Sequence, residues 1–174
     1  DPWGLILGIW EDLILLDETG TPVMEAILCS DGRATEEAGE IAAMLGREEI
    51  ERVTANQFDG SRPVAKLLWV KRHMPEVYRR TAHALLSAKD YVVAKLTGVM
   101  VTDVTSASTA GLMDIQAGCW RLDWLESAGL TSVLWARLRS AEECVGQACR
   151  RAAHETGYPE GIPVYAGAGD AGAT

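Results

Sequence analysis

Asp170 is the residue whose surroundings best suit catalysis. It follows the apolar segment 162–165 and lies in a run composed of Gly and Ala. Because these neighbours have minimal side chains, a substrate hydroxyl could approach the carboxylate closely. A carboxylate held there can accept the proton of a hydroxyl that attacks an electrophile. We therefore expect Asp170 to act as a general base, and the alternative is that Asp170 is only a turn residue after a strand.

The glycines around Asp170 also fit a dinucleotide-binding pattern, Gly167-x-Gly169-x-x-Gly172. That fingerprint requires a following helix whose N-terminus holds the pyrophosphate, and an acidic residue about 20 positions further on. The sequence ends at Thr174, and Asp170 would place a negative charge in a loop meant for phosphates. A dinucleotide-binding oxidoreductase is therefore the weaker alternative.

Glu11 and Asp12 form a second acidic position. They interrupt two apolar runs of strand length, 5–10 and 13–16. Charges rarely end a buried strand without a partner or a ligand, so the pair is a candidate binding position. A solvated turn between two strands is the alternative.

Asp31 lies between a predicted strand over 23–28 and a predicted helix over 35–45. This is the kind of edge at which open α/β sheets bind ligands. The alternative is that Asp31 caps the helix or pairs with Arg33.

Glycine, proline and capping residues predict where the helices begin and end. Lys66 and Trp69 lie one turn apart, which puts both on one face of the helix predicted before Pro75. We expect Trp69 to lie in the core and Lys66 to reach solvent from the rim of the core. The expected helices are 35–45 before Gly46, 61–73 with Pro63 in its first turn and Pro75 just past its end, 88–96 after Ser87, and 148–156 before Gly157.

Composition narrows the function classes. The chain has 174 residues, 48% of them hydrophobic, and a formal net charge of -9. This charge argues against nucleic-acid binding and against an anionic membrane surface. The four cysteines form no CxxC pair, so we expect them to be reduced thiols and expect no metal site in this chain. No run approaches a membrane span and no basic-then-apolar leader opens the chain, so we expect a cytoplasmic protein.

Several ordered blocks give the chain a family resemblance. It resembles the central part of the FGGY carbohydrate kinases, most closely the xylulokinase and L-xylulokinase branch. The blocks are Ala26 to Arg33, the signature Ser61-x-Pro63-x-x-Lys66-Leu67-x-Trp69-Val70-x-Arg72-His73, Ala88-Lys89-Asp90-Tyr91 with Leu96-Thr97-Gly98, and Gly161 to Asp170.

The resemblance implies an α/β fold of the actin-like (ribonuclease H-like) kinase type, with a mixed sheet and flanking helices. Residues 1–174 would be part of the N-terminal sugar-binding domain of an enzyme that uses ATP and magnesium to phosphorylate a sugar or polyol, such as xylulose. Asp170 matches the family's catalytic base. Phosphoryl transfer needs mainly positioning and charge neutralisation, so one well-placed carboxylate is about all the general-base chemistry that it requires. Trp10, Glu11 and Asp31 match its sugar-contacting positions.

The chain departs from the xylulokinase pattern at several of these positions. Xylulokinases usually have Met-His where Trp10-Glu11 stands, and glycerol kinases have Arg-Glu. Cys29 replaces a Trp, and Ala171 replaces an Asn. These departures leave the sugar open.

The resemblance also implies segments that this sequence does not contain. The family's first phosphate-binding hairpin and its C-terminal nucleotide-binding domain are absent, so no ATP-binding residue is assigned and we expect the chain by itself to be inactive. The expected partner is a small sugar or polyol, and a homodimer is left open. A degenerate relative that binds sugar without catalysis is the remaining alternative.

Overall fold

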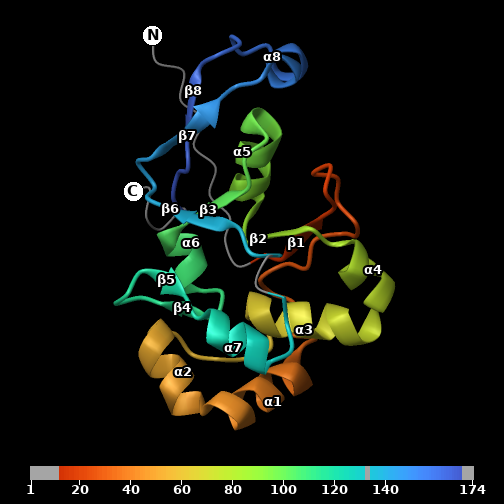
Figure 1. Cartoon of the computed structure of the whole chain (residues 1–174), viewed down its shortest axis with the longest axis vertical. Helices are drawn as coiled ribbons and strands as arrows, with labels where there is room; N and C mark the ends of the chain where they lie inside the picture. Colours follow the sequence, from red (N-terminus) through yellow and green to blue (C-terminus); the bar gives the residue numbers. More distant parts are fainter. Residues whose placement is uncertain (1–11, 132–133, 170–174) are drawn as a thin grey trace.

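The fold is organised around β1 (Ile14–Leu16), which is buried on both faces. The computed structural model describes residues 12–131 and 134–169 (Figure 1). β1 pairs antiparallel with β2 (His83–Leu85), with Ile14 opposite Leu85. Successive side chains of a strand point to opposite faces. Leu15 therefore joins the larger core cluster, whereas Ile14 and its partner Leu85 join the smaller one.

A group of helices covers one side of β1 and fills the lower part of Figure 1. Its centre is α3, which buries all of its residues from Pro63 to Leu68. Pro63 occupies the first turn, where a missing backbone N–H costs nothing, and Pro75 begins the next helix. The helices are α1 (Thr35–Leu45), α2 (Arg47–Thr54), α3 (Pro63–His73), α4 (Pro75–Arg80) and α7 (Leu122–Ser127).

Of the remaining elements, β7, β8 and α8 lie at the opposite end from these helices, whereas β4 and β5 lie beside them (Figure 1). Within the described ranges the strands form four two-stranded sheets, of which the β3–β6 pair is parallel. The elements are α5 (Ala88–Thr97), β3 (Val101–Asp103), α6 (Val104–Ser108), β4 (Met113–Asp114), β5 (Cys119–Trp120), β6 (Arg137–Arg139), β7 (Cys144–Gln147), α8 (Arg150–Thr156) and β8 (Pro163–Tyr165).

The helix predicted over 35–45 is confirmed with the same bounds, and the helix predicted over 61–73 is confirmed but begins at Pro63. The strand predicted over 23–28 is wrong, because this segment contributes only an isolated bridge between Ile27 and Leu13. The predicted strand run 5–10 lies outside the described residues. All four cysteines are free thiols, as expected. Of the helices in the described ranges, none is long and apolar enough to cross a membrane.

Candidate functional site

Of the four residues predicted to contact substrate or catalyse, the structure describes Asp31. Trp10, Glu11 and Asp170 lie outside the described residues. The described part of the candidate site therefore consists of Asp31 and the segments adjacent to Glu11 and Asp170.

Asp31 is held by Arg33 in a two-pronged ion pair. The Arg33 Nε lies 3.0 and 2.9 Å from the two carboxylate oxygens, and a terminal guanidinium nitrogen lies 2.6 Å from Oδ2. These hydrogen bonds lower the pKa of Asp31 to about 2, so the carboxylate is ionised at neutral pH. Its side chain remains 28% exposed. Asp31 can therefore still accept a hydrogen bond from a hydroxyl group in solution.

The ion pair rests on an aromatic stack. The Arg33 guanidinium lies 4.8 Å from the centre of the Trp69 ring, and Trp69 in turn stacks on His73 at 4.7 Å. Arg33 does not belong to the helix that follows, since α1 begins at Thr35 and its N-cap Ala34 makes no side-chain cap. Of the alternatives left open for Asp31, pairing with Arg33 is therefore confirmed and helix capping is not found.

Lys66 is fully buried, which corrects the prediction that it reaches solvent from the rim of the core. Its Nζ donates a hydrogen bond of 2.8 Å to the Leu28 carbonyl. Trp69, predicted to lie in the core, is half-buried and packs against the edge of the larger cluster. Lys66 is therefore more buried than predicted and Trp69 less, and the Lys66 ammonium secures the segment that precedes Asp31.

Asp12 ties the start of β1 to the same segment. Its carboxylate accepts a hydrogen bond from the Cys29 amide at 3.2 Å, and the backbones of Leu13 and Ile27 exchange two hydrogen bonds. Burial raises the pKa of Asp12, although the Cys29 amide and the charge of Lys66 act in the opposite direction. The segment that follows Glu11 therefore lies beside the segment that leads to Asp31.

A second buried ion cluster lies beneath the C-terminal strand β8. The Lys89 Nζ is 2.7 Å from Asp90 Oδ1, 3.1 Å from Asp103 Oδ1 and 2.9 Å from the carbonyl oxygen of Ala166. An ammonium group has three hydrogens, so these acceptors match its donors. Removing one partner from such a buried pair typically costs about 3–5 kcal/mol.

The pKa values of the two carboxylates in this cluster are shifted in opposite directions. Burial raises the pKa of Asp90, and the charge and hydrogen bond of Lys89 only partly offset this. Burial also acts to raise the pKa of Asp103, but the hydrogen bonds from Ser106 and the charge of Lys89 outweigh it and the pKa is lowered. Asp103 also caps α6 through the amides of Thr105 and Ser106. It is thus the ionised anchor of the cluster.

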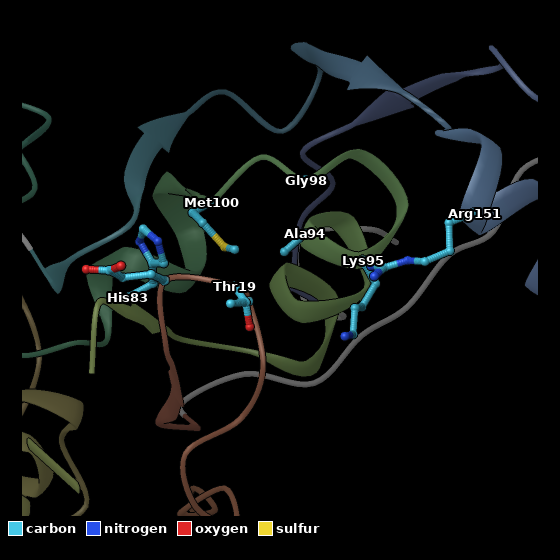
Figure 2. A pocket seen from close by; sticks show the side chains of 9 residues that line it. Thr19, His83, Ala94, Lys95, Gly98, Met100 and Arg151 are labelled. Carbon is cyan, nitrogen blue, oxygen red and sulfur yellow. The ribbon is translucent and has the colours of Figure 1, made fainter. Parts of the chain in front are cut away.

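A pocket of about 230 Å³ lies elsewhere on the molecule (Figure 2). His83 stands on one side of it and Lys95 and Arg151 on the other, with Met100 and Ala94 between them. None of the described sugar-site candidates lines it. Its lining consists of Glu18, Thr19, Gly20, His83, Ala94, Lys95, Gly98, Met100 and Arg151.

The described residues hold no ready-made cluster of metal-ligating side chains. Over 12–131 and 134–169, no three His, Cys, Asp or Glu side chains come together as a set that could hold a metal ion. No step of the chemistry is therefore assigned to a metal held by these residues.

The sequence reasoning missed Lys66, Lys89 and Asp103 as site-supporting residues. Both lysines lie within blocks that carry the family resemblance, which is the one signal that could have identified them. Asp103 lies in a stretch of small polar residues whose pattern indicates only a connection.

Comparison with known proteins identifies the class to which this geometry belongs. The xylulose kinase of Bacillus subtilis (strain 168) is 32% identical over 94% of this chain and 32% of its own length. An autoinducer-2 kinase of Photorhabdus laumondii subsp. laumondii is 30% identical over 92% of this chain and 30% of its own length. This chain thus spans about a third of the length of these relatives.

Solved structures agree. The crystal structure of xylulose kinase from Rhodospirillum rubrum matches with a TM-score of 0.86 and 31% identity, over 92% of this chain and 33% of that one. Plasmodium falciparum glycerol kinase with ADP matches with a TM-score of 0.78 and 25% identity, over 93% of this chain and 33% of that one. The expected actin-like α/β fold is therefore confirmed. Residues 6–174 match the family model for the N-terminal domain of the FGGY carbohydrate kinases, and the chain belongs to this family.

Proposed function

We propose that this chain is part of the sugar-binding domain of a longer kinase, called the parent kinase below, which phosphorylates a sugar or polyol with ATP. The observation that carries the proposal is the family match over residues 6–174. A pentulose such as xylulose is the preferred substrate class, because xylulose kinases occur among both the sequence relatives and the structural neighbours.

Asp170 is the general base in this proposal. Its carboxylate takes the proton of the attacking hydroxyl as the new oxygen–phosphorus bond forms and the bond between the γ-phosphorus and the bridging oxygen of ADP breaks. Support comes from the position of β8, which leads directly into the Gly and Ala run that carries Asp170. ATP and magnesium would be held mainly by parts of the parent kinase beyond the described residues.

The proposed sugar contacts are Trp10, Glu11 and Asp31. Asp31 supports this role by being ionised, held in a fixed orientation and partly exposed. Glu11 immediately precedes Asp12, whose carboxylate secures the neighbouring segment. A carboxylate can bind hydroxyl groups through charge-assisted hydrogen bonds, which are stronger than those of a neutral amide.

A second candidate substrate is autoinducer-2, because several relatives at 28–30% identity are named autoinducer-2 kinases. A sugar-binding protein without catalysis is the other alternative. It predicts sugar affinity without ADP formation. Membership of the carbohydrate kinase family favours a kinase or a sugar-binding relative of a kinase over a dinucleotide-binding oxidoreductase.

The test is ADP formation by the parent kinase with a substrate panel of xylulose, ribulose, glycerol and autoinducer-2. We expect the highest kcat/KM with a pentulose. A higher kcat/KM with autoinducer-2 would move the assignment to that substrate. Calorimetric sugar binding without any sugar-dependent ADP formation would contradict the kinase proposal and support the binding protein.

A further inference from the structure

The contact between Lys89 and the end of β8 is not explained by packing alone. Lys89 lies at the start of α5, and its ammonium reaches the Ala166 carbonyl, 77 residues further along the chain. Ala166 is the first residue after β8 and lies four residues before Asp170.

The Lys89 ammonium links its own helix to two segments that are distant in sequence. Asp90 belongs to the first turn of α5, Asp103 ends β3 and begins α6, and Ala166 follows β8. The side chains of Asp90 and Asp103 are fully buried and that of Lys89 is 6% exposed. A buried ammonium favours a fixed geometry, since each of its hydrogens needs an acceptor that water cannot replace.

Gly167 packs against the stem of the same lysine. It has a φ of +72°, and a Cβ added there would lie 3.1 Å from the Lys89 Cδ. Its amide donates to the Ala141 carbonyl, while the Ala166 amide donates to the Glu143 carbonyl. The backbone at 166–167 is therefore held from two sides, by Lys89 and by the segment 141–143. A side chain at position 167 would disturb both the φ angle and the lysine stem.

We propose that Lys89 is a positioning residue for the reaction, because it fixes the point at which the loop carrying Asp170 leaves β8. The inference rests on the proposed role of Asp170 as general base. Lys89 does not touch the substrate in this account. It acts through the Ala166 carbonyl, while Asp90 and Asp103 hold its ammonium in place.

The kinetic test uses Lys89→Met in the parent kinase, which keeps the length of the side chain and removes its charge and donors. Lys95→Met on the same helix is the matched control, because the Lys95 ammonium lies over the Tyr91 ring rather than in the buried cluster. Misplacing a catalytic group by about 1 Å can cost on the order of 100-fold in rate. We expect kcat to fall roughly 10- to 100-fold in Lys89→Met, with KM for sugar and ATP nearly unchanged. Lys95→Met should keep the parental kcat.

A merely structural role predicts another result. Lys89→Met would then lower the melting temperature, while kcat for each folded molecule would stay within about threefold of the parent, far from the loss expected for a misplaced base. That outcome would overturn the proposal.

Gly167→Ala keeps the proposal testable if Lys89→Met does not fold. Its matched control is Gly161→Ala, because Gly161 has a similar φ of +83° but only the end of the Gln147 side chain at 4.0 Å from an added Cβ. Both variants carry the same backbone strain, and only Gly167→Ala presses on Lys89. We expect a fall in kcat in Gly167→Ala alone. Equal kcat values in the two variants would contradict the proposal.

Hydrogen exchange separates failure of this inference from failure of the proposed function. If the parent kinase forms no ADP with any sugar, the role of Asp170 as base fails, but the anchor can still be measured. Lys89→Met should then speed exchange at the Ala166 and Gly167 amides more than at the amides of α3. The anchor is refuted if those two amides exchange as in the parent protein.

Discussion

Lys66 and Lys89 perform the same physical task at two places in the fold. Each ammonium is buried, and each donates to a backbone carbonyl, that of Leu28 or that of Ala166. A carbonyl oxygen can accept two hydrogen bonds, and the Leu28 carbonyl also accepts one from the Asp31 amide, so Lys66 adds a second donor there. Both carbonyls lie a few residues before a predicted site residue, Asp31 in one case and Asp170 in the other.

The Asp31–Arg33 pair gives a pH-dependent prediction. The pKa of Asp31 in the folded chain is about 2, below the usual value of about 3.9 for an aspartate in an unfolded chain. The pair therefore stabilises the fold fully above pH 4, and this contribution is lost as the pH falls toward 2. In Arg33→Met we expect the pKa of Asp31 to return toward its usual range, as measured by carbon-13 NMR titration.

Arg72→Met is the control for this titration, because Arg72 pairs with Glu40 and not with Asp31. It should leave the pKa of Asp31 low. An unchanged Asp31 pKa in Arg33→Met would mean that Arg33 does not hold the carboxylate.

Glu11→Ala tests the proposed sugar contact in the parent kinase. We expect the KM for sugar to rise by an amount equivalent to roughly 1.5–3 kcal/mol, the value of a hydrogen bond to a charged group. The KM for ATP should change little. Glu25→Ala, at an exposed carboxylate nearby in sequence, should resemble the parent. Equal changes in both KM values in Glu11→Ala would argue against a sugar contact.

The candidate site could be predicted from the sequence only in part. The ion pair of Asp31 with Arg33 was one of the local alternatives, since residues two apart in a turn can meet. The burial of Lys66 could not be predicted, because helical spacing shows which face a residue shares but not what covers that face. The roles of Trp10, Glu11 and Asp170 stay predictions.

At the scale of elements, the loop before α3 is packed tightly against the start of α1. A Cβ added at Gly60 would lie 2.6 Å from the Thr35 backbone nitrogen and 2.9 Å from the Ala34 carbonyl carbon. Such distances are too short for any side chain, so the absence of a Cβ at Gly60 allows the two segments to meet. This contact fixes the position of α1 relative to α3, and with it the segment that contains Asp31.

Gly60→Ala should therefore destabilise the fold by about 1–3 kcal/mol, as overpacking of a close contact does. Gly39→Ala is the matched control within α1, at an exposed position with open space around it. Alanine is the better helix former, so this variant should be more stable by about 0.5–1 kcal/mol. Urea denaturation measures both, and a Gly60→Ala variant as stable as the parent would show that the loop can move away.

Helices were predicted better than strands for a physical reason. The bounds of α1 and α3 are set by residues within or next to the helix, such as Gly46, Pro63 and Pro75. The apolar run 23–28 has the composition of a strand, but it obtains only a bridge at Ile27 from its neighbour. Strand formation depends on partners that are distant in the chain, and these cannot be read from a local pattern.

At the scale of the whole molecule, the fold secures two segments that each lead to a predicted site residue. β1 is covered on both faces, and the segment at 27–31 is fastened to it through Asp12 and Lys66. The end of β8 is fastened through Lys89 to α5 and to the start of α6. In the proposed kinase, these two attachments would set the sugar contacts and the general base independently of each other.

The most direct test of this account is Asp170→Asn in the parent kinase. Asparagine keeps the shape and hydrogen-bonding reach of the side chain but lacks its basicity. We expect sugar affinity, measured by calorimetry, to be retained while kcat falls by about 10²–10⁴, the usual contribution of general-base catalysis. If Asp170 is only a turn residue, asparagine should replace it with little effect. A kcat within about threefold of the parent, far short of a general-base loss, would contradict the account.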